Sequence, residues 1–239
     1  MKRETAMTKV IAILGAGSGL AVSVARRYGK QGYAVALVAR NPDKLQALAD
    51  GIASEDVGAI ALLRTCLLPR TQAILARFGR IDILYYAPNP VDRCIPAMEL
   101  TPEALQQRID LYFYGLVAAV NAVLPVLLER GEGRVLSGFG GSAQVGFPGT
   151  SGTGPAMAAA RNYLQSLQQE LVERGIEVDV VAITAAVRNS AFHRELQAGG
   201  AASSGITSEI PEAAPEQLAE LLDEAASDPE RLEACFPTA

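Results

Sequence analysis

The sequence is poor in cysteine and in basic residues, and both shortages exclude classes of protein. Its three cysteines, Cys66, Cys94 and Cys235, lie far apart without the spacing of a metal site, as expected of reduced thiols in the cytosol. Lysine and arginine total 21 against 26 acidic residues, and the net charge of −5 argues against nucleic acid or an anionic membrane as the main partner. We therefore expect no bound metal and a small-molecule substrate or ligand.

Long apolar runs are also missing. Lys2 and Arg3 precede an apolar run that resembles a secretory signal, but Gly15, Gly17 and Gly19 interrupt it. Other segments fall short of the roughly 20 uninterrupted apolar residues of a membrane span. The sequence therefore predicts a soluble, cytoplasmic protein without a membrane segment.

Short apolar, β-branched runs alternate with amphipathic stretches of helical length, which is typical of a parallel sheet. With 239 residues, 49% of them hydrophobic, we expect one domain over residues 1–239. Its predicted fold is a Rossmann-type doubly wound α/β sheet, the centre of a three-layer α/β/α sandwich. The predicted strands are 10–14, 34–39, 59–63, 81–86, 134–137 and 177–183. The predicted helices are 20–31, 42–52, 70–78, 102–130 and 155–174.

Residues 184–211 follow the last predicted strand, are rich in Ala, Gly and Ser, and show little sign of secondary structure. A loop at the carboxyl end of a parallel strand is where open α/β sheets bind ligands. This segment is interpreted as a substrate loop or lid, with a surface excursion that binds nothing as the alternative.

A glycine-rich turn joins the first strand to the first helix. Glycines there permit positive φ and let backbone N–H groups approach a pyrophosphate at the helix N-terminus, where the helix dipole favours negative charge. The position between strand and helix predicts a dinucleotide site, with a turn that binds no ligand as the alternative. The predicted cofactor contacts of this turn are Gly15, Gly17, Ser18, Gly19 and Leu20.

The second predicted strand ends in Ala39, Arg40 and Asn41. In NAD-binding folds an acidic residue at this strand tip accepts hydrogen bonds from the ribose hydroxyls, whereas an arginine favours the 2′-phosphate. The tip therefore predicts NADP(H), bound by Arg40 and Asn41. A solvated arginine at a strand end is the alternative.

Several spacings along the chain coincide with those of one enzyme family. The matching residues are Gly15 and Gly19 of a G-x-x-x-G-x-G signature, residues 78–84 before the fourth strand, Gly115 and Pro125 in the long central helix, and Glu170, Leu171, Gly175 and Ile176 near the sixth strand. Only the third glycine differs, because Ala21 replaces it. In these features the chain resembles the short-chain dehydrogenase/reductase (SDR) family along nearly its whole length.

The resemblance implies four catalytic positions: an asparagine, a serine, and the tyrosine and lysine of Y-x-x-x-K. Counting from the central-helix glycine, the asparagine position falls on Tyr112. Counting from Glu170, the tyrosine position falls on Thr153 and the lysine position on Met157. None of these residue types matches the family.

The serine position falls on Phe139 or Gly140, with Ser137 and Ser142 on either side. No lysine follows Lys44, so no shifted alignment restores the Tyr-Lys pair, nor the Y-x6-K pair of SDR-type enoyl reductases. In the family the lysine lowers the pKa of the tyrosine, which exchanges a proton with the substrate. A positioned acid contributes about 10²–10⁴ in rate, so ordinary carbonyl reduction is expected to be crippled.

Further departures lie on the same side of the sheet. The N-N-A-G after the family's fourth strand corresponds to residues 85–88 here, of which Ala87 is an expected cofactor contact, and the P-G after its sixth strand corresponds to Ile183 and Thr184. No acidic residue follows the third strand in 64–66. The chain also ends without the family's glycine-rich last strand, which weakens the case for a tetramer.

Three polar groups remain as catalytic candidates around the expected pocket. Tyr112 can donate a proton, with aromatic packing as its alternative role. His193, the only histidine, suits acid–base work near neutral pH, with a solvated lid position as its alternative. Thr153 can hydrogen-bond a ligand but is too weak an acid to replace a tyrosine.

These observations leave three functions open. The first is an NADP(H)-dependent oxidoreductase of the SDR type that acts on an activated double bond or retains weak activity. The second is a pseudo-enzyme, either a non-catalytic subunit or a ligand-binding module, and the third is a non-redox enzyme such as a cyclase or dehydratase. The resemblance also implies a homodimer or homotetramer, packed through the helix residues 157–160, or a paralogous SDR subunit as partner.

Overall fold

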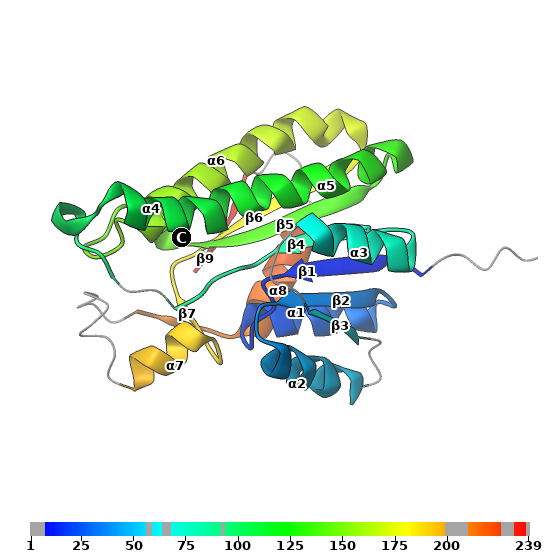
Figure 1. Ribbon diagram of the computed structural model, residues 1–239, viewed down its shortest axis with the longest axis horizontal. Helices are drawn as coiled ribbons and strands as arrows, with labels where there is room; N and C mark the ends of the chain where they lie inside the picture. Colours follow the sequence, from blue (N-terminus) through cyan, green and yellow to red (C-terminus); the bar gives the residue numbers. More distant parts are fainter. Residues whose placement is uncertain are drawn as a thin grey trace, which may run out of the picture.

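The computed structural model describes residues 8–55, 59–63, 68–91, 94–198, 210–225 and 232–237, with the backbone alone at 59–63 and 68–70. A single parallel sheet of seven strands lies between two layers of helices (Figure 1). Its strands, in spatial order, are β3 (Ala59–Leu63), β2 (Ala34–Ala39), β1 (Val10–Leu14), β4 (Ile83–Tyr86), β5 (Gly133–Gly140), β6 (Ile176–Ile183) and β9 (Ala234–Phe236). This order confirms the predicted doubly wound α/β fold.

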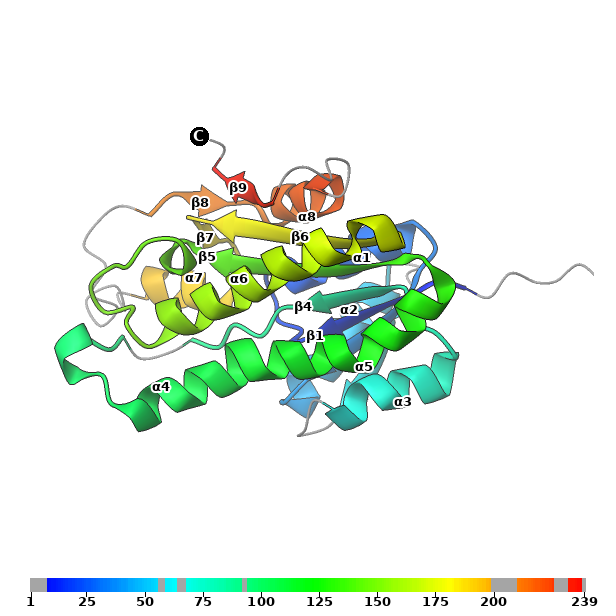
Figure 2. The ribbon, with the colours of Figure 1, turned by 90° about the horizontal axis from the view of Figure 1, so that it is seen from above.

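Helices cover both faces of the sheet (Figures 1 and 2). One face carries α1 (Leu20–Lys30), α2 (Pro42–Ala53) and α8 (Pro215–Glu224). The other carries α3 (Leu68–Phe78), α4 (Pro102–Ile109), α5 (Gly115–Arg130) and α6 (Thr153–Leu171). Short 3-10 helices occur at Ala97–Glu99, Gly141–Ala143 and Val172–Arg174.

Alternation along the strands divides the core in two. In β1, Val10, Ala12 and Leu14 pack with α5 and α6, whereas Ile11 and Ile13 pack with α1, α2 and α8. Because both faces are covered, every position of this strand is buried. This explains why the central strands are continuous apolar runs in the sequence.

The predicted helix 102–130 is one helical run in three parts, with a π-helical turn at Asp110–Tyr114 between α4 and α5. Thr101 caps it, since its hydroxyl accepts from the Ala104 N–H at 3.2 Å. By length and composition, with a mean hydropathy of 2.0, this run is apolar enough to cross a membrane. The run is not one of 20 uninterrupted apolar residues, because Asn121 interrupts it, and the core helix of a soluble protein passes the same test of length and composition.

The C-terminal part contains more secondary structure than the sequence predicts. Two short strands, β7 (Ala186–Val187) and β8 (Glu212–Ala213), pair in parallel and flank α7 (Ala191–Gln197). The interpretation of 184–211 as poorly structured is therefore wrong for its described parts, while 199–209 lie outside the described residues. Elements this short fall below the window in which hydrophobic periodicity can be recognised.

The expected lack of a last strand is also wrong. β9 pairs with β6 through Ala234, Cys235 and Phe236, opposite Val181, Ala182 and Ile183. The strand is not glycine-rich, but backbone pairing does not need glycine. A three-residue strand is set by its neighbour rather than by its own sequence pattern.

Residues 157–160 do not form the outward helix face that was predicted. Met157 and Ala160 are buried in the core, with exposed fractions of 6% and 0%, and Ala158 and Ala159 are half-buried. Four consecutive residues turn through most of the circumference of a helix, at about 100° each, so they cannot share one face. The predicted face is therefore wrong for Met157 and Ala160, while Ala158 and Ala159 keep surface that a partner could cover.

Candidate nucleotide-binding and active site

The glycine-rich turn after β1 lies where the strand order reverses. β1 pairs with β2 on one side and with β4 on the other, and ligands of open α/β sheets bind at such a point, beyond the carboxyl ends of the strands. The N–H groups of Gly15 and Ala16 both donate to the Val38 carbonyl, at 2.8 and 2.9 Å. The turn is thus anchored across the end of the neighbouring strand.

Gly15 is required at its position. Its φ is +87°, and a Cβ added there would lie 2.5 Å from the Cα of Pro88 and 2.8 Å from the carbonyl carbon of Ala87. The Ala87 N–H in turn donates to the Leu14 carbonyl at 2.8 Å. The segment after β4 therefore packs directly on the turn, and the predicted contact Ala87 lies beside it.

The turn is open at Gly17, whereas Gly19 lies against Ser190, whose Cβ would be 3.0 Å from a Cβ there. A Cβ on Gly17 would meet no atom within 4 Å. Gly19 precedes α1, whose first turn, beginning at Leu20, has neither a side-chain cap nor an acidic residue. Its first N–H groups and the positive end of the helix dipole thus remain available for phosphate oxygens. These residues fit a dinucleotide.

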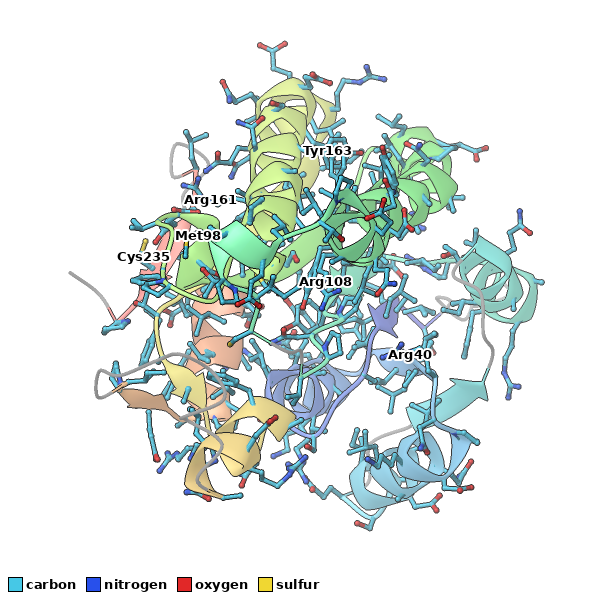
Figure 3. The ribbon with its side chains drawn as sticks, turned by 60° about the vertical axis from the view of Figure 1, so that its left-hand side comes forward. Arg40, Met98, Arg108, Arg161, Tyr163 and Cys235 are labelled. Carbon is cyan, nitrogen blue, oxygen red and sulfur yellow. The ribbon has the colours of Figure 1, made fainter. Side chains whose placement is uncertain are left out.

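The tip of β2 holds Arg40 and Asn41 in different roles. Arg40 is exposed and lies at the carboxyl edge of the sheet (Figure 3). The Asn41 side chain accepts from the Lys44 N–H at 2.9 Å and caps α2. Capping explains the asparagine at this position without a ligand, and it leaves Arg40 as the group that can reach one.

Tyr112 lies in the π-helical turn and is 4% exposed. Its hydroxyl donates to Oδ1 of Asn89, in the segment after β4, at 3.2 Å. Nearby, the Tyr86 hydroxyl donates to the Leu111 carbonyl of the same turn. Burial, together with the neighbouring Tyr112, raises the pKa of Tyr86 well above its usual value. The asparagine position of the family is thus part of a buried aromatic pair.

The first turn of α6 carries the tyrosine and lysine positions. Thr153 begins the helix and is half-buried. Met157, one turn later, packs in the core against the sheet. A thioether in the core offers no proton and no charge to a ligand.

Two serines flank the serine position but lie in different places. Ser137 is 1% exposed, and its hydroxyl donates to the Tyr86 carbonyl at 2.9 Å, so it belongs to the core. The hydroxyl of Ser142 lies 3.9 Å from where a Cβ on Gly140 would be, and its carbonyl lies 2.9 Å from where a Cβ on Gly154 would be. Ser142 therefore lies between the serine position and the first turn of α6.

Arg108 is a site residue that the sequence did not indicate. It extends from α4 toward α6, with its Nε 3.5 Å and its Cδ 3.8 Å from where a Cβ on Gly152 would be (Figure 3). Its Nη1 donates to the Ala104 carbonyl at 3.0 Å. A guanidinium thus lies beside the residue that precedes Thr153. An arginine on a helix surface carries no motif, so only the packing of α4 on α6 reveals it.

His193 is buried, with an exposed fraction of 7%, and is not the solvated lid histidine considered as its alternative. Its Nε2 lies 3.0 Å from Oε1 of Glu212 in β8 and 3.3 Å from the side-chain nitrogen of Gln197. Among the described residues these ring contacts hold α7 to β8. The ring therefore contacts Glu212 and Gln197 rather than the first turn of α6, where Thr153 lies.

Within the described residues, no group of three or more His, Cys, Asp or Glu side chains could hold a metal ion. Cys94 and Cys235 are half-buried, whereas Cys66 lies outside the described residues.

The sheet order and the turn at its switch point define an α/β protein of the Rossmann class. The short chain dehydrogenase family matches residues 9–198, and the chain belongs to that family. Its relatives include oxidoreductases of several bacteria.

One relative is the 2-dehydro-3-deoxy-L-rhamnonate dehydrogenase (NAD(+)) of a Sphingomonas species, 28% identical over 165 residues that cover 69% of this chain and 66% of the relative. A solved variant of actinorhodin polyketide ketoreductase with NADPH has a TM-score of 0.81 at 20% identity, with 95% of each chain covered. A metagenomic short-chain oxidoreductase in complex with NADP has a TM-score of 0.68 at 18% identity, covering 86% of this chain and 96% of the other. These structural likenesses establish the fold.

Proposed function

We propose that the protein binds NADP(H) at the β1–α1 turn and acts as an SDR-type oxidoreductase without the family's usual proton donor. The observation that carries the proposal is the shape of the turn, in which Gly15 packs on Pro88 and the first turn of α1 is left uncapped. The family takes both nicotinamide cofactors, since one relative is named for NAD(+) and two neighbours hold NADPH or NADP. Arg40 at the strand tip favours the 2′-phosphate form.

When bound, the cofactor supplies a hydride to an electron-poor carbon of the substrate. A simple ketone also needs a proton at its oxygen, and Thr153 at the tyrosine position is too weak an acid to give it efficiently. An activated double bond is the better substrate class. Hydride forms a C–H bond at its β-carbon, the π electrons move onto the carbonyl oxygen, and solvent protonates the resulting enolate.

Three side chains of this chain can orient such a substrate. Ser142 and Thr153 place hydroxyls around the first turn of α6, and Arg108 places a positive charge beside it. A carbonyl oxygen that gains negative charge would be stabilised by these donors. Tyr112 and His193 remain the candidate proton donors, although both already have hydrogen-bond partners.

A second function, a pseudo-enzyme or a repurposed non-redox enzyme, has its own support. Met157 is packed in the core and offers no acid–base group, and the His193 ring already contacts Glu212. A non-catalytic subunit or ligand-binding module would keep the nucleotide cradle and lose the proton relay. A cyclase or dehydratase would use the pocket without any hydride.

The same proposal extends to assembly and location. We propose a soluble cytoplasmic homodimer or homotetramer, or a pair with a paralogous SDR subunit, that takes a small molecule and no nucleic acid. Tyr114, on the helical run 102–130, is 55% exposed and offers an apolar contact on its outer side. Met157 and Ala160 are too buried to take part in such an interface, whereas the half-buried Ala158 and Ala159 keep surface for it.

Titration of the purified protein with NADPH and NADH tests the proposal. Tight binding of NADPH and weaker binding of NADH would support the proposed cofactor. Reduction of an α,β-unsaturated carbonyl compound by the NADPH-loaded protein would support the proposed oxidoreductase function. Failure to bind either nucleotide would overturn the proposed function and leave a pseudo-enzyme or a non-redox enzyme as the alternatives.

A further inference from the structure

Three residues fasten α7 to the glycine-rich turn. The Ser18 hydroxyl donates to the Asn189 carbonyl at 2.7 Å, and Nη1 of Arg194 lies 3.0 Å from the Ser18 oxygen and donates to the same carbonyl at 2.7 Å. We call Ser18, Asn189 and Arg194 the clasp. It joins two segments that are 171 residues apart in the chain.

The backbone around the clasp is specifically shaped. Asn189 has a φ of +63°, the only non-glycine residue with positive φ in the described part of the chain. The next residue, Ser190, lies so close to Gly19 that a Cβ there would be 3.0 Å from the Ser190 Cβ. The N–H of His193 donates to the Ser190 hydroxyl at 3.0 Å, which fixes the first turn of α7. α7 is thereby aimed at the N-terminus of α1.

The charge of Arg194 is not balanced at this place. The N-terminus of α1 carries the positive end of the helix dipole, so a guanidinium beside it is unfavourable unless an anion is present. Among the described residues no carboxylate pairs with Arg194, and the first turn of α1 has no acidic residue. An anion bound there would therefore interact favourably with both the helix and the arginine.

Two donors of the clasp converge on one acceptor. The Ser18 hydroxyl and the Arg194 guanidinium both point at a single oxygen, the Asn189 carbonyl. A phosphate oxygen is a stronger acceptor for the same donors, because charge-assisted hydrogen bonds are roughly twice as strong as neutral ones. Such an oxygen would replace the carbonyl in the clasp.

We infer that Arg194, with Ser18, binds the pyrophosphate of the nucleotide, with α7 beside the bound cofactor. The inference rests on the proposed function of the β1–α1 turn and deepens it. It gives Arg40 and Arg194 different roles, since Arg40 would recognise the 2′-phosphate and Arg194 the pyrophosphate shared by all nicotinamide dinucleotides.

Fragments of the cofactor test this division of roles. ADP-ribose carries the pyrophosphate without the 2′-phosphate, and 2′-AMP carries the 2′-phosphate without the pyrophosphate. By titration calorimetry, Arg194→Gln is expected to weaken ADP-ribose, NADH and NADPH about ten- to a hundredfold each and to leave 2′-AMP within about twofold. Arg40→Gln is expected to weaken 2′-AMP and NADPH and to leave ADP-ribose unchanged.

Two further variants distinguish a direct contact of Arg194 from a general effect of lost positive charge. Lys30→Gln removes one positive charge at the far end of α1 and should bind all four compounds like the wild type. Arg194→Lys keeps the charge and should recover part of the ADP-ribose affinity. Circular dichroism and thermal melting confirm that each variant is folded.

The outcomes separate the two proposals. If Arg194→Gln binds ADP-ribose as tightly as the wild type does, the role of Arg194 is overturned and the nucleotide site stands. A wild type that binds none of NADPH, NADH and ADP-ribose overturns the nucleotide site itself, and the role of Arg194 with it.

Discussion

Pro88 lies directly against Gly15, so that a Cβ on the glycine would be 2.5 Å from the Cα of the proline. The contact joins the end of β1 to the segment after β4 at the switch point of the sheet. In this chain the proline stands at the position of a glycine in the family's N-N-A-G, so it is part of the departure from the usual site. The close approach explains why position 15 needs a glycine.

This contact predicts a difference between two neighbouring glycines. Gly15→Ala is expected to lower the free energy of unfolding by about 1–3 kcal/mol, because φ is +87° and the Cβ would overlap backbone. Gly17→Ala places its Cβ in open space and should keep the wild-type stability while weakening NADPH binding. Urea denaturation and nucleotide titration of both variants provide the measurement. Wild-type stability of Gly15→Ala would contradict the close packing.

Cofactor choice is predicted to depend on Arg40. Arg40→Asp should weaken NADPH about ten- to a hundredfold while changing NADH little, because it replaces a charge-assisted contact to the 2′-phosphate with repulsion. Asn41→Ala is the matched control at the adjacent position, and it should cost helix stability through the lost cap rather than cofactor selectivity. Equal losses for both nucleotides, or none, would remove Arg40 from the site.

Catalysis is predicted to be absent with ordinary ketones and secondary alcohols, since neither Thr153 nor Met157 can replace the Tyr-Lys pair. Any reduction of an activated double bond should survive Thr153→Ala within a fewfold. It should fall on Tyr112→Phe or His193→Ala, by up to about 10²–10⁴ if either is the general acid. The steady-state reduction rates of the wild type and the variants are measured with a simple ketone and with an enone. Rapid reduction of the ketone by the wild type would contradict the prediction.

A structural control is needed for these two variants. Tyr112→Phe removes only a hydroxyl, but His193→Ala also removes the contact between α7 and β8. Glu212→Gln keeps the histidine and changes only its partner, so it reports whether that contact alone affects the rate. Full activity in both Tyr112→Phe and His193→Ala, with loss in Thr153→Ala, would move the proton donor to α6.

Stability is predicted to depend on pH through Asp179. This carboxyl is 3% exposed and lies 3.0 Å from Nη2 of Arg134, and burial raises its pKa to about 6 despite the arginine. The folded state then binds more protons than the unfolded state between about pH 4 and pH 6. The contribution of Asp179 to stability is therefore complete below the pKa that it has in the unfolded chain. It is lost as the pH rises through the pKa that it has in the folded protein.

The measurement is a comparison of the wild type with Asp179→Asn by urea unfolding at pH 4.5 and pH 7. The free energy of unfolding of the wild type minus that of the variant should be higher at pH 4.5 than at pH 7, by at most about 3 kcal/mol. Because the other carboxyl groups are present in both proteins, their contribution to the pH dependence drops out of the difference. An unchanged or reversed difference would show that Arg134 keeps the Asp179 pKa low.

Elements with a local signal could be predicted from the sequence. Runs such as Val10 to Leu14 are buried on both faces and therefore apolar throughout, so the first six strands of the main sheet could be predicted with ends within three residues. The glycine-rich turn needed no tertiary information either, because positive φ at Gly15 is a property of the backbone there. The lack of any lysine beyond Lys44 is likewise a fact of the sequence alone.

Only the tertiary structure decided which distant side chains meet. Arg108 approaches Gly152, His193 meets Glu212, and Arg194 reaches Ser18 across 176 residues of chain. None of these contacts leaves a periodic trace, because each depends on how two elements pack and not on the propensity of either. The strand β9 has the same origin, since three residues adopt the extended form only because β6 offers its edge.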